Sequence, residues 1–163
     1  MRYIGIALAL SFMIPFQTVY AQDDARKQLY GTWRLVSFSV QVVGEDVPPR
    51  DIFGPTPFGR LILTPEHYMM AYLSKHDRKP PINETEAAAL LSSMIVYTGK
   101  FRLEDDKLIT TVDGAWNETY KANEQIRYIN MNGDKLSIQT AEQPSGTMPG
   151  KRVVGTLSWE REK

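Results

Sequence analysis

The chain has 163 residues, with 19 basic and 19 acidic side chains and no cysteine. Balanced charge argues against a nucleic-acid partner, which needs a strongly basic surface. The lack of cysteine within these residues excludes disulfides, thiolate metal sites and thiol nucleophiles, so packing must stabilise the fold.

The first 21 residues have the three regions of a signal peptide. Arg2 supplies the positive charge, residues 3–16 form a mostly apolar run too short to span a bilayer, and Val19-Tyr20-Ala21 precedes the polar Gln22. We expect cleavage after Ala21. Residues 22–163 would then form one domain of an exported protein, periplasmic or secreted, with no membrane span. An uncleaved anchor helix is the alternative.

Residues 31–43 are rich in β-branched, aromatic and apolar side chains and begin with Gly31-x-Trp33. A glycine two residues before a tryptophan allows a tight bend at the start of a strand and places a large indole in the interior. We predict a long strand over residues 31–43. A loop rich in proline and glycine follows over residues 44–57.

A β-hairpin comes next, because the strand-like residues 59–63 and 68–73 flank the turn Thr64-Pro65-Glu66-His67. Downstream, Asn83 is suited to cap a short amphipathic helix. The apolar residues that follow it at helical spacing are Ala87, Leu90, Leu91 and Met94.

The rest of the chain predicts further strands. Residues 95–103 and 107–113 flank an acidic turn, residues 124–131 and 135–140 flank Asn132-Gly133-Asp134, and residues 152–161 form a final strand. Gly99 falls on the apolar face at mid-strand, which suggests a bend or a close approach of another segment. We therefore predict an all-β fold. Eight antiparallel strands close into an up-and-down barrel with room for a small ligand, and the short helix covers one end.

Both ends of this barrel resemble the lipocalin-like domain proteins of the calycin superfamily. The resemblance rests on Gly31-Thr32-Trp33-Arg34-Leu35-Val36 and on Gly155-Thr156-Leu157-Ser158-Trp159-Glu160-Arg161, and Tyr97-Thr98-Gly99-Lys100-Phe101 supports it. It covers residues 22–163. It implies an eight-stranded barrel that binds small hydrophobic or amphipathic molecules, with Arg161 crossing the indole of Trp33 in a structural role.

Two positions depart from related barrels. Some relatives carry paired histidines where this chain has Thr110-Thr111, so a histidine-based site is not predicted. Fatty-acid-binding proteins hold a carboxylate with an Arg-x-Tyr pair on the last strand, where this chain has Leu157 and Trp159. A fatty acid held in that way is therefore not expected.

Arg127 is the most informative candidate for ligand binding. Ile129 and Met131 on the same strand face are apolar, so period-two alternation carries Arg127 and Gln125 into the barrel. A guanidinium in an apolar interior needs a counter-charge. An anionic or carbonyl group of a ligand would supply it.

Two alternatives remain for Arg127: a structural pair with Asp113 or Glu124, or the opposite register, with the side chain in water.

Other candidates for the ligand site are aromatic, and core packing explains them equally well: Tyr72, Tyr97 and Phe101. Met69, Met70 and Met94 are candidates for adaptable walls.

No pattern in the sequence predicts a metal, a cofactor or a nucleophile. His67 and His76 lack the spacing of metal ligands and are interpreted as solvated, and no Gly-x-Ser-x-Gly elbow occurs. The leading hypothesis is an exported binding protein without catalysis. One alternative is a small cavity enzyme of the isomerase or cyclase type, using Arg127, Asp113, Glu124 and tyrosines. The other is a domain that acts through its outer surface.

Asn83-Glu84-Thr85 and Asn117-Glu118-Thr119 match the acceptor pattern for N-glycosylation in predicted surface segments. They matter only if the source is eukaryotic.

Overall fold

A computed structural model of the chain describes residues 27–145 and 148–163. The predicted signal peptide and its cleavage site after Ala21 lie outside the described residues. Eight long strands are present in this part of the chain: β1 (Gly31–Val42), β3 (Phe58–Leu63), β4 (Tyr68–Ser74), β5 (Met94–Glu104), β6 (Lys107–Ala115), β7 (Gln125–Asn132), β8 (Lys135–Thr140) and β10 (Arg152–Arg161). The shorter elements are β2 (Arg50–Asp51), β9 (Gln143–Pro144), the helix α2 (Glu84–Ser92) and the 3-10 turn η1 (Glu118–Lys121).

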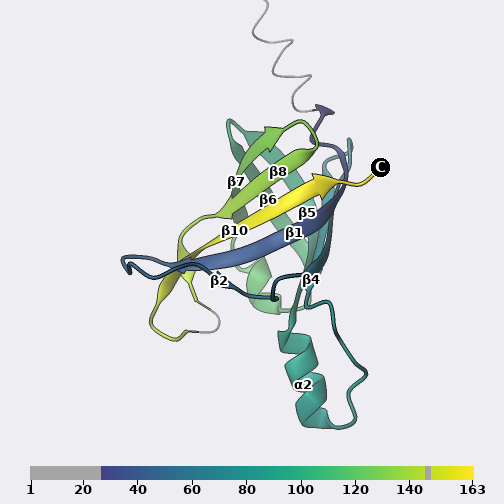
Figure 1. Cartoon of the computed structure of the whole chain (residues 1–163). Helices are drawn as coiled ribbons and strands as arrows, with labels where there is room; N and C mark the ends of the chain where they lie inside the picture. The colour runs from purple at the N-terminus through teal and green to yellow at the C-terminus, as the bar shows by residue number, and fades with distance from the viewer. Residues whose placement is uncertain (1–26, 146–147) are drawn as a thin grey trace, which may run out of the picture.

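The strands form a closed up-and-down barrel, as the sequence predicts (Figure 1). Each long strand pairs antiparallel with its neighbour in the order β1-β3-β4-β5-β6-β7-β8-β10, and β10 pairs back with β1 from Trp33↔Arg161 to Val42↔Val153. A bulge between Leu35 and Ser37 shifts the register of β1. Before the bulge the odd-numbered residues of β1, such as Leu35, face the interior. After it the even-numbered residues, such as Phe38, do so.

The interior has a packed half and a hollow half. Large apolar side chains fill the half where β1 begins and β10 ends; the most buried of them include Trp33, Leu35, Leu63, Leu108, Leu136 and Trp159. The hollow half lies towards the other end of these strands, where Phe38 and Val40 of β1 and Val153 of β10 line an open cavity. The ligand space of this barrel is therefore confined to one end.

Gly99 marks a close approach of two strands, which confirms the prediction for this position. A side-chain carbon at Gly99 would lie 2.1 Å from the backbone oxygen of Thr111 on β6. The pairing of β5 with β6 shifts between Thr98 and Gly99. Only a residue without a side chain fits this place.

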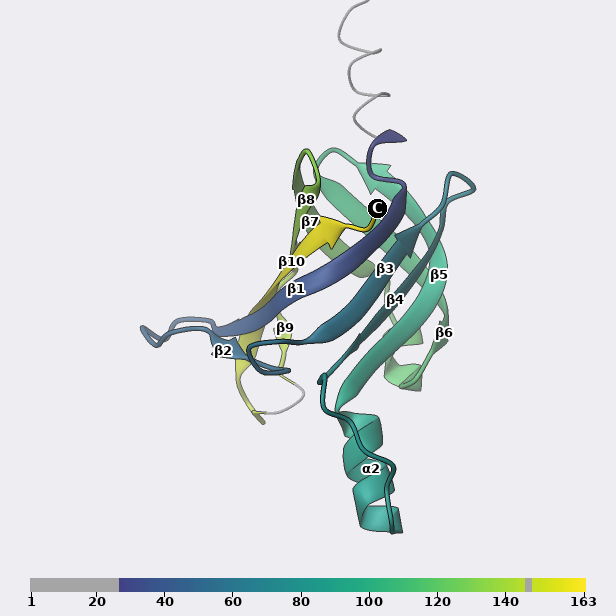
Figure 2. The same cartoon turned by 45° about the vertical axis from the view of Figure 1, so that its right-hand side comes forward.

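The helix α2 begins at its predicted cap, where Oδ1 of Asn83 accepts a hydrogen bond of 2.9 Å from the backbone N–H of Glu86. The sequence predicts that the helix covers an end of the barrel, and only its last turn borders the cavity there, through Leu91 and Ser92. The rest of the helix projects away from that end (Figures 1 and 2), and none of its residues is buried. Met94, which the helical spacing included, begins β5.

The side chain of Arg78 explains the direction of α2. Its Nη2 donates to the backbone oxygen of Leu90 at 2.9 Å, and its Nη1 donates to the hydroxyl of Tyr72 at 2.8 Å. Tyr72 belongs to the outer face of β4, because Ala71 and Leu73 on either side of it are buried. Arg78 therefore fastens the end of α2 to the outside of the barrel. Within the described ranges, no helix is long and apolar enough to cross a membrane.

Candidate ligand-binding site

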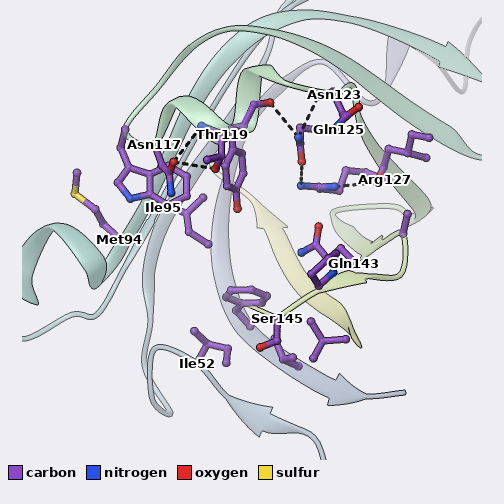
Figure 3. A pocket seen from close by; sticks show the side chains of 18 of the residues that line it. Ile52, Met94, Ile95, Asn117, Thr119, Asn123, Gln125, Arg127, Gln143 and Ser145 are labelled. Carbon is purple, nitrogen blue, oxygen red and sulfur yellow. Dashed lines mark hydrogen bonds between the residues drawn. The ribbon is translucent and has the colours of Figure 1, made fainter. Parts of the chain in front are cut away.

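The cavity in the hollow half has a volume of about 1130 Å³ and is open to solvent. That volume suits a small organic molecule. Its walls come from β1, β5, β7 and β10 and from segments that connect strands at this end, including η1 and β9 (Figure 3).

One wall of the cavity is aromatic and comes from the segment after β6. The rings of Trp116 and Tyr120 meet edge to face at 4.5 Å between centroids, and the ring of Tyr97 on β5 lies 5.6 Å from that of Tyr120. The backbone N–H of Trp116 donates to the oxygen of Val96 at 2.9 Å. Asn117 caps η1 by accepting from the N–H of Thr119. The backbone thus holds this wall in place.

A second aromatic pair lies on the opposite wall. The rings of Phe38 on β1 and Phe53 in the following loop are 5.6 Å apart, and both line the cavity. Around the closed barrel, three long strands separate β1 from β6 in either direction. Phe38 and Trp116, which follows the end of β6, therefore face each other across the cavity.

Arg127 lies between these walls on β7. It is only 8% exposed, and both of its terminal nitrogens are engaged. Nη1 donates to the backbone oxygen of Ile126 at 2.9 Å, and Nη2 donates to Oε1 of Gln125 at 3.1 Å. The Gln125 amide nitrogen in turn donates to the backbone oxygens of Tyr120 and Asn123 (Figure 3). Gln125 thereby fixes the guanidinium in the cavity.

No carboxylate in the described residues pairs with Arg127. Glu124 lines the cavity, but both its oxygens accept from Arg102, at 2.5 and 3.0 Å. These bonds to Arg102 lower the pKa of Glu124. Asp113 accepts from the hydroxyl of Thr98 at 2.5 Å. Arg127 therefore forms no ion pair with Asp113 or Glu124. Its side chain also does not point into water, so neither alternative from the sequence applies.

The two other glutamates of the lining are also engaged. Glu118 pairs with Lys121 at 2.7 Å, and Glu142 pairs with Arg152. Arg127 is thus a buried cation without an anionic partner in this part of the chain. Such a group favours an anion that enters the cavity.

Tyr120 adds a second polar group beside the guanidinium. Burial raises the pKa of its phenol above the ordinary value, while the positive charge of Arg127 acts in the opposite direction. The phenol therefore stays protonated at neutral pH. In that state it can donate a hydrogen bond to a ligand.

The structure places the five candidate ligand residues in four regions. Gln125 and Arg127 line the cavity, and Tyr97 lies buried behind Tyr120. Tyr72 and Phe101 are outside the lining. Tyr72 faces outward because of its phase in β4, and Phe101 is in the packed half, with its ring 5.5 Å from that of His67. Alternation predicts which side of a strand a residue takes, but not how far along the barrel the cavity extends.

The sequence did not predict several residues of the cavity lining, including Trp116, Tyr120, Phe38 and Gln143. A signal for the first two was present, since they are bulky aromatic residues within an otherwise polar loop. Trp116 is the tryptophan of the cavity, whereas Trp33 and Trp159 belong to the packed core. Nothing in the local pattern around Gln143 distinguishes it from a surface residue.

The described residues contain no group of three or more histidine or carboxylate side chains that could hold a metal ion.

In comparisons of sequence, no curated protein matches the chain. The model of the family described as a lipocalin-like domain matches residues 30–162, nearly the whole barrel. With its closed eight-stranded barrel and this match, the chain belongs to the lipocalin-like domain family.

Proposed function

We propose that this chain is an exported binding protein whose cavity holds an amphipathic small molecule with an apolar body and one acidic or carbonyl group. The buried guanidinium of Arg127, which has no carboxylate partner in the described residues, is the observation that carries the proposal. It lies in a cavity whose walls combine apolar and aromatic side chains with polar ones.

The free energy of a buried charge supports a role in binding. Removing a guanidinium from water is costly unless charged or strongly polar partners replace the water. Gln125 and one backbone oxygen satisfy only part of its five N–H donors. A carboxylate that reaches Arg127 would accept the remaining donors and neutralise the charge.

Binding is favoured over catalysis by the positions of the candidate acids. A cavity enzyme of the isomerase or cyclase type would need a proton donor or acceptor near the bound molecule. Asp113 and Glu124 bond to Thr98 and Arg102. Among the catalytic candidates from the sequence, this leaves Arg127 and tyrosines to face a ligand.

A titration of the purified protein tests the proposal. The probes are an amphipathic carboxylic acid and a neutral analogue with methyl in place of the carboxyl group. Binding is followed by tryptophan emission, to which Trp116 in the cavity contributes. Arg127→Met should weaken binding of the acid about 10-fold or more, because charge-assisted hydrogen bonds are lost. The neutral analogue should bind within about 2-fold of its original affinity.

Arg34→Met is the matched control, since Arg34 is exposed and pairs with Glu160 on the outer surface. It should leave both affinities unchanged. If Arg127→Met did not alter the preference for the acid, Arg127 would not contact the ligand. If neither probe bound to any variant, a domain that acts through its outer surface would be the better proposal.

Export rests on the leader and has its own test. N-terminal sequencing of the protein recovered from its source should begin at Gln22. Membrane-bound protein that retains Met1 would show an anchor in place of a cleaved leader.

A further inference from the structure

We infer that the cavity selects a compact aromatic carboxylate over a straight-chain fatty acid. This inference rests on the proposed function and narrows the class of ligand. It follows from two features of the cavity: its two aromatic walls and the amides in its lining that have no hydrogen-bond partner among the described residues.

The lining extends to different depths on different strands. On β7 it includes Gln125 and Arg127, but not the inward-facing Ile129 that follows. On β1 it extends to Phe38, which pairs with Leu157, whereas on β10 it includes Val153 but not Leu157. Arg127 therefore lies on one wall of the cavity, close to the packed half of the barrel.

The walls suit a flat ring. Phe38 and Phe53 form one aromatic pair, and Trp116 and Tyr120 form the other on the opposite side. Rings gain from stacked and edge-to-face contacts that an alkyl chain cannot make in the same way. Arg127 on β7 is next to the strand that leads to Trp116, so an acid group on the ring can reach the guanidinium.

Two polar side chains of the lining disfavour contact with a long alkyl tail. The side-chain amides of Asn123 and Gln143 line the cavity (Figure 3), and no hydrogen bond ties either amide group to another described residue. An alkyl tail that covered them would remove them from water without offering a partner. A shorter, rigid ring held between the aromatic walls can leave both amides hydrated.

Calorimetric titration with matched acids tests this selection. The probes are 2-naphthoic acid and undecanoic acid, which have the same number of carbon atoms and are both ionised at pH 7. Undecanoic acid has the more flexible and more apolar body, so the hydrophobic effect alone favours it. We expect 2-naphthoic acid to bind about 10-fold more tightly.

Variants assign the preference to the walls. Trp116→Leu should reduce affinity for 2-naphthoic acid about 5-fold and leave that for undecanoic acid unchanged, whereas Trp116→Phe should retain most of the preference. Arg127→Met should weaken both acids alike. Circular dichroism of each variant confirms that the barrel is folded.

The outcomes separate the two proposals. If undecanoic acid bound as tightly as 2-naphthoic acid and still depended on Arg127, the selection for rings would be overturned and the proposed function would stand. If the preference for 2-naphthoic acid survived in Trp116→Leu, the aromatic walls would not be its cause. If neither acid bound to the unaltered protein, both proposals would fall.

Discussion

The guanidinium of Arg161 covers the indole of Trp33, with 4.1 Å between its Cζ atom and the ring centroid. Nη1 of Arg161 also donates to the backbone oxygen of Tyr30 at 3.0 Å. The indole N–H of Trp33 donates to the backbone oxygen of Leu29 at 2.9 Å. A residue of the last strand thus closes the packed end over a residue of the first strand. This contact lies at the opposite end of the barrel from the cavity.

The first prediction concerns this closure. Trp33→Ala should lower the free energy of unfolding by about 3 to 5 kcal/mol, since Trp33 is fully buried. Arg161→Ala should cost less, about 1 to 2 kcal/mol. Urea denaturation of both variants and of the double variant measures their coupling, which should exceed about 0.5 kcal/mol. Strictly additive losses would mean that the cation–π contact contributes nothing to stability.

The second prediction is that Arg127→Met raises stability. Methionine fills a similar space without a buried charge, so the free energy of unfolding should increase by about 1 kcal/mol or more in the absence of ligand. Arg34→Met is the control, and it should change stability by about 0.5 kcal/mol or less because its ion pair is exposed. A large loss of stability in Arg127→Met would instead assign Arg127 a structural role.

The third prediction concerns the approach of β6 to β5 at Gly99. Gly99→Ala should lower the free energy of unfolding by about 3 kcal/mol or more, because the new methyl group would meet the backbone oxygen of Thr111. Gly114→Ala is a milder comparison. Its methyl group would lie 3.1 Å from the hydroxyl of Thr98, a side chain that can move. Equal effects in chemical denaturation would contradict the close approach at Gly99.

The fourth prediction is the pH dependence that Tyr120 contributes. Burial raises the pKa of its phenol in the folded state, so the folded protein keeps this proton at a pH where the unfolded chain loses it. The stabilisation is fully present below about pH 10, the ordinary value for tyrosine, and is lost as the pH rises through the folded-state pKa. Denaturation curves measured between about pH 9 and pH 11 should show this loss of stability in the unaltered protein but not in Tyr120→Phe.

Arg127 provides a check on the same group. Its charge lowers the pKa of Tyr120, so Arg127→Met should raise that pKa further. Ultraviolet difference titration against the matching Tyr120→Phe variant isolates this phenol from the other tyrosines. An unchanged titration in Arg127→Met would mean that the two groups do not interact.

The strand positions and the direction of Arg127 could be predicted because they depend on local chemistry. Turn residues and alternation indicate the hairpins, and alternation with Ile129 and Met131 predicts that Arg127 points inward. The direction of α2 could not be predicted in the same way. It depends on Arg78, which bonds at once to Leu90 and to Tyr72 on another element.

By itself, the sequence determined the positions and order of the strands and the inward register of β7, since these follow from turns and alternation among neighbouring residues. The number of strands and the resemblance to lipocalin-like domains predicted the closure of the barrel. The tertiary structure alone decided which half of the barrel is hollow, that Phe38 faces Trp116, and that Arg102 engages Glu124 while Arg127 has no carboxylate partner in the described residues. Packing and charge pairing join side chains that are distant along the chain. Their partners are therefore set by distances in the folded barrel, which no local pattern encodes.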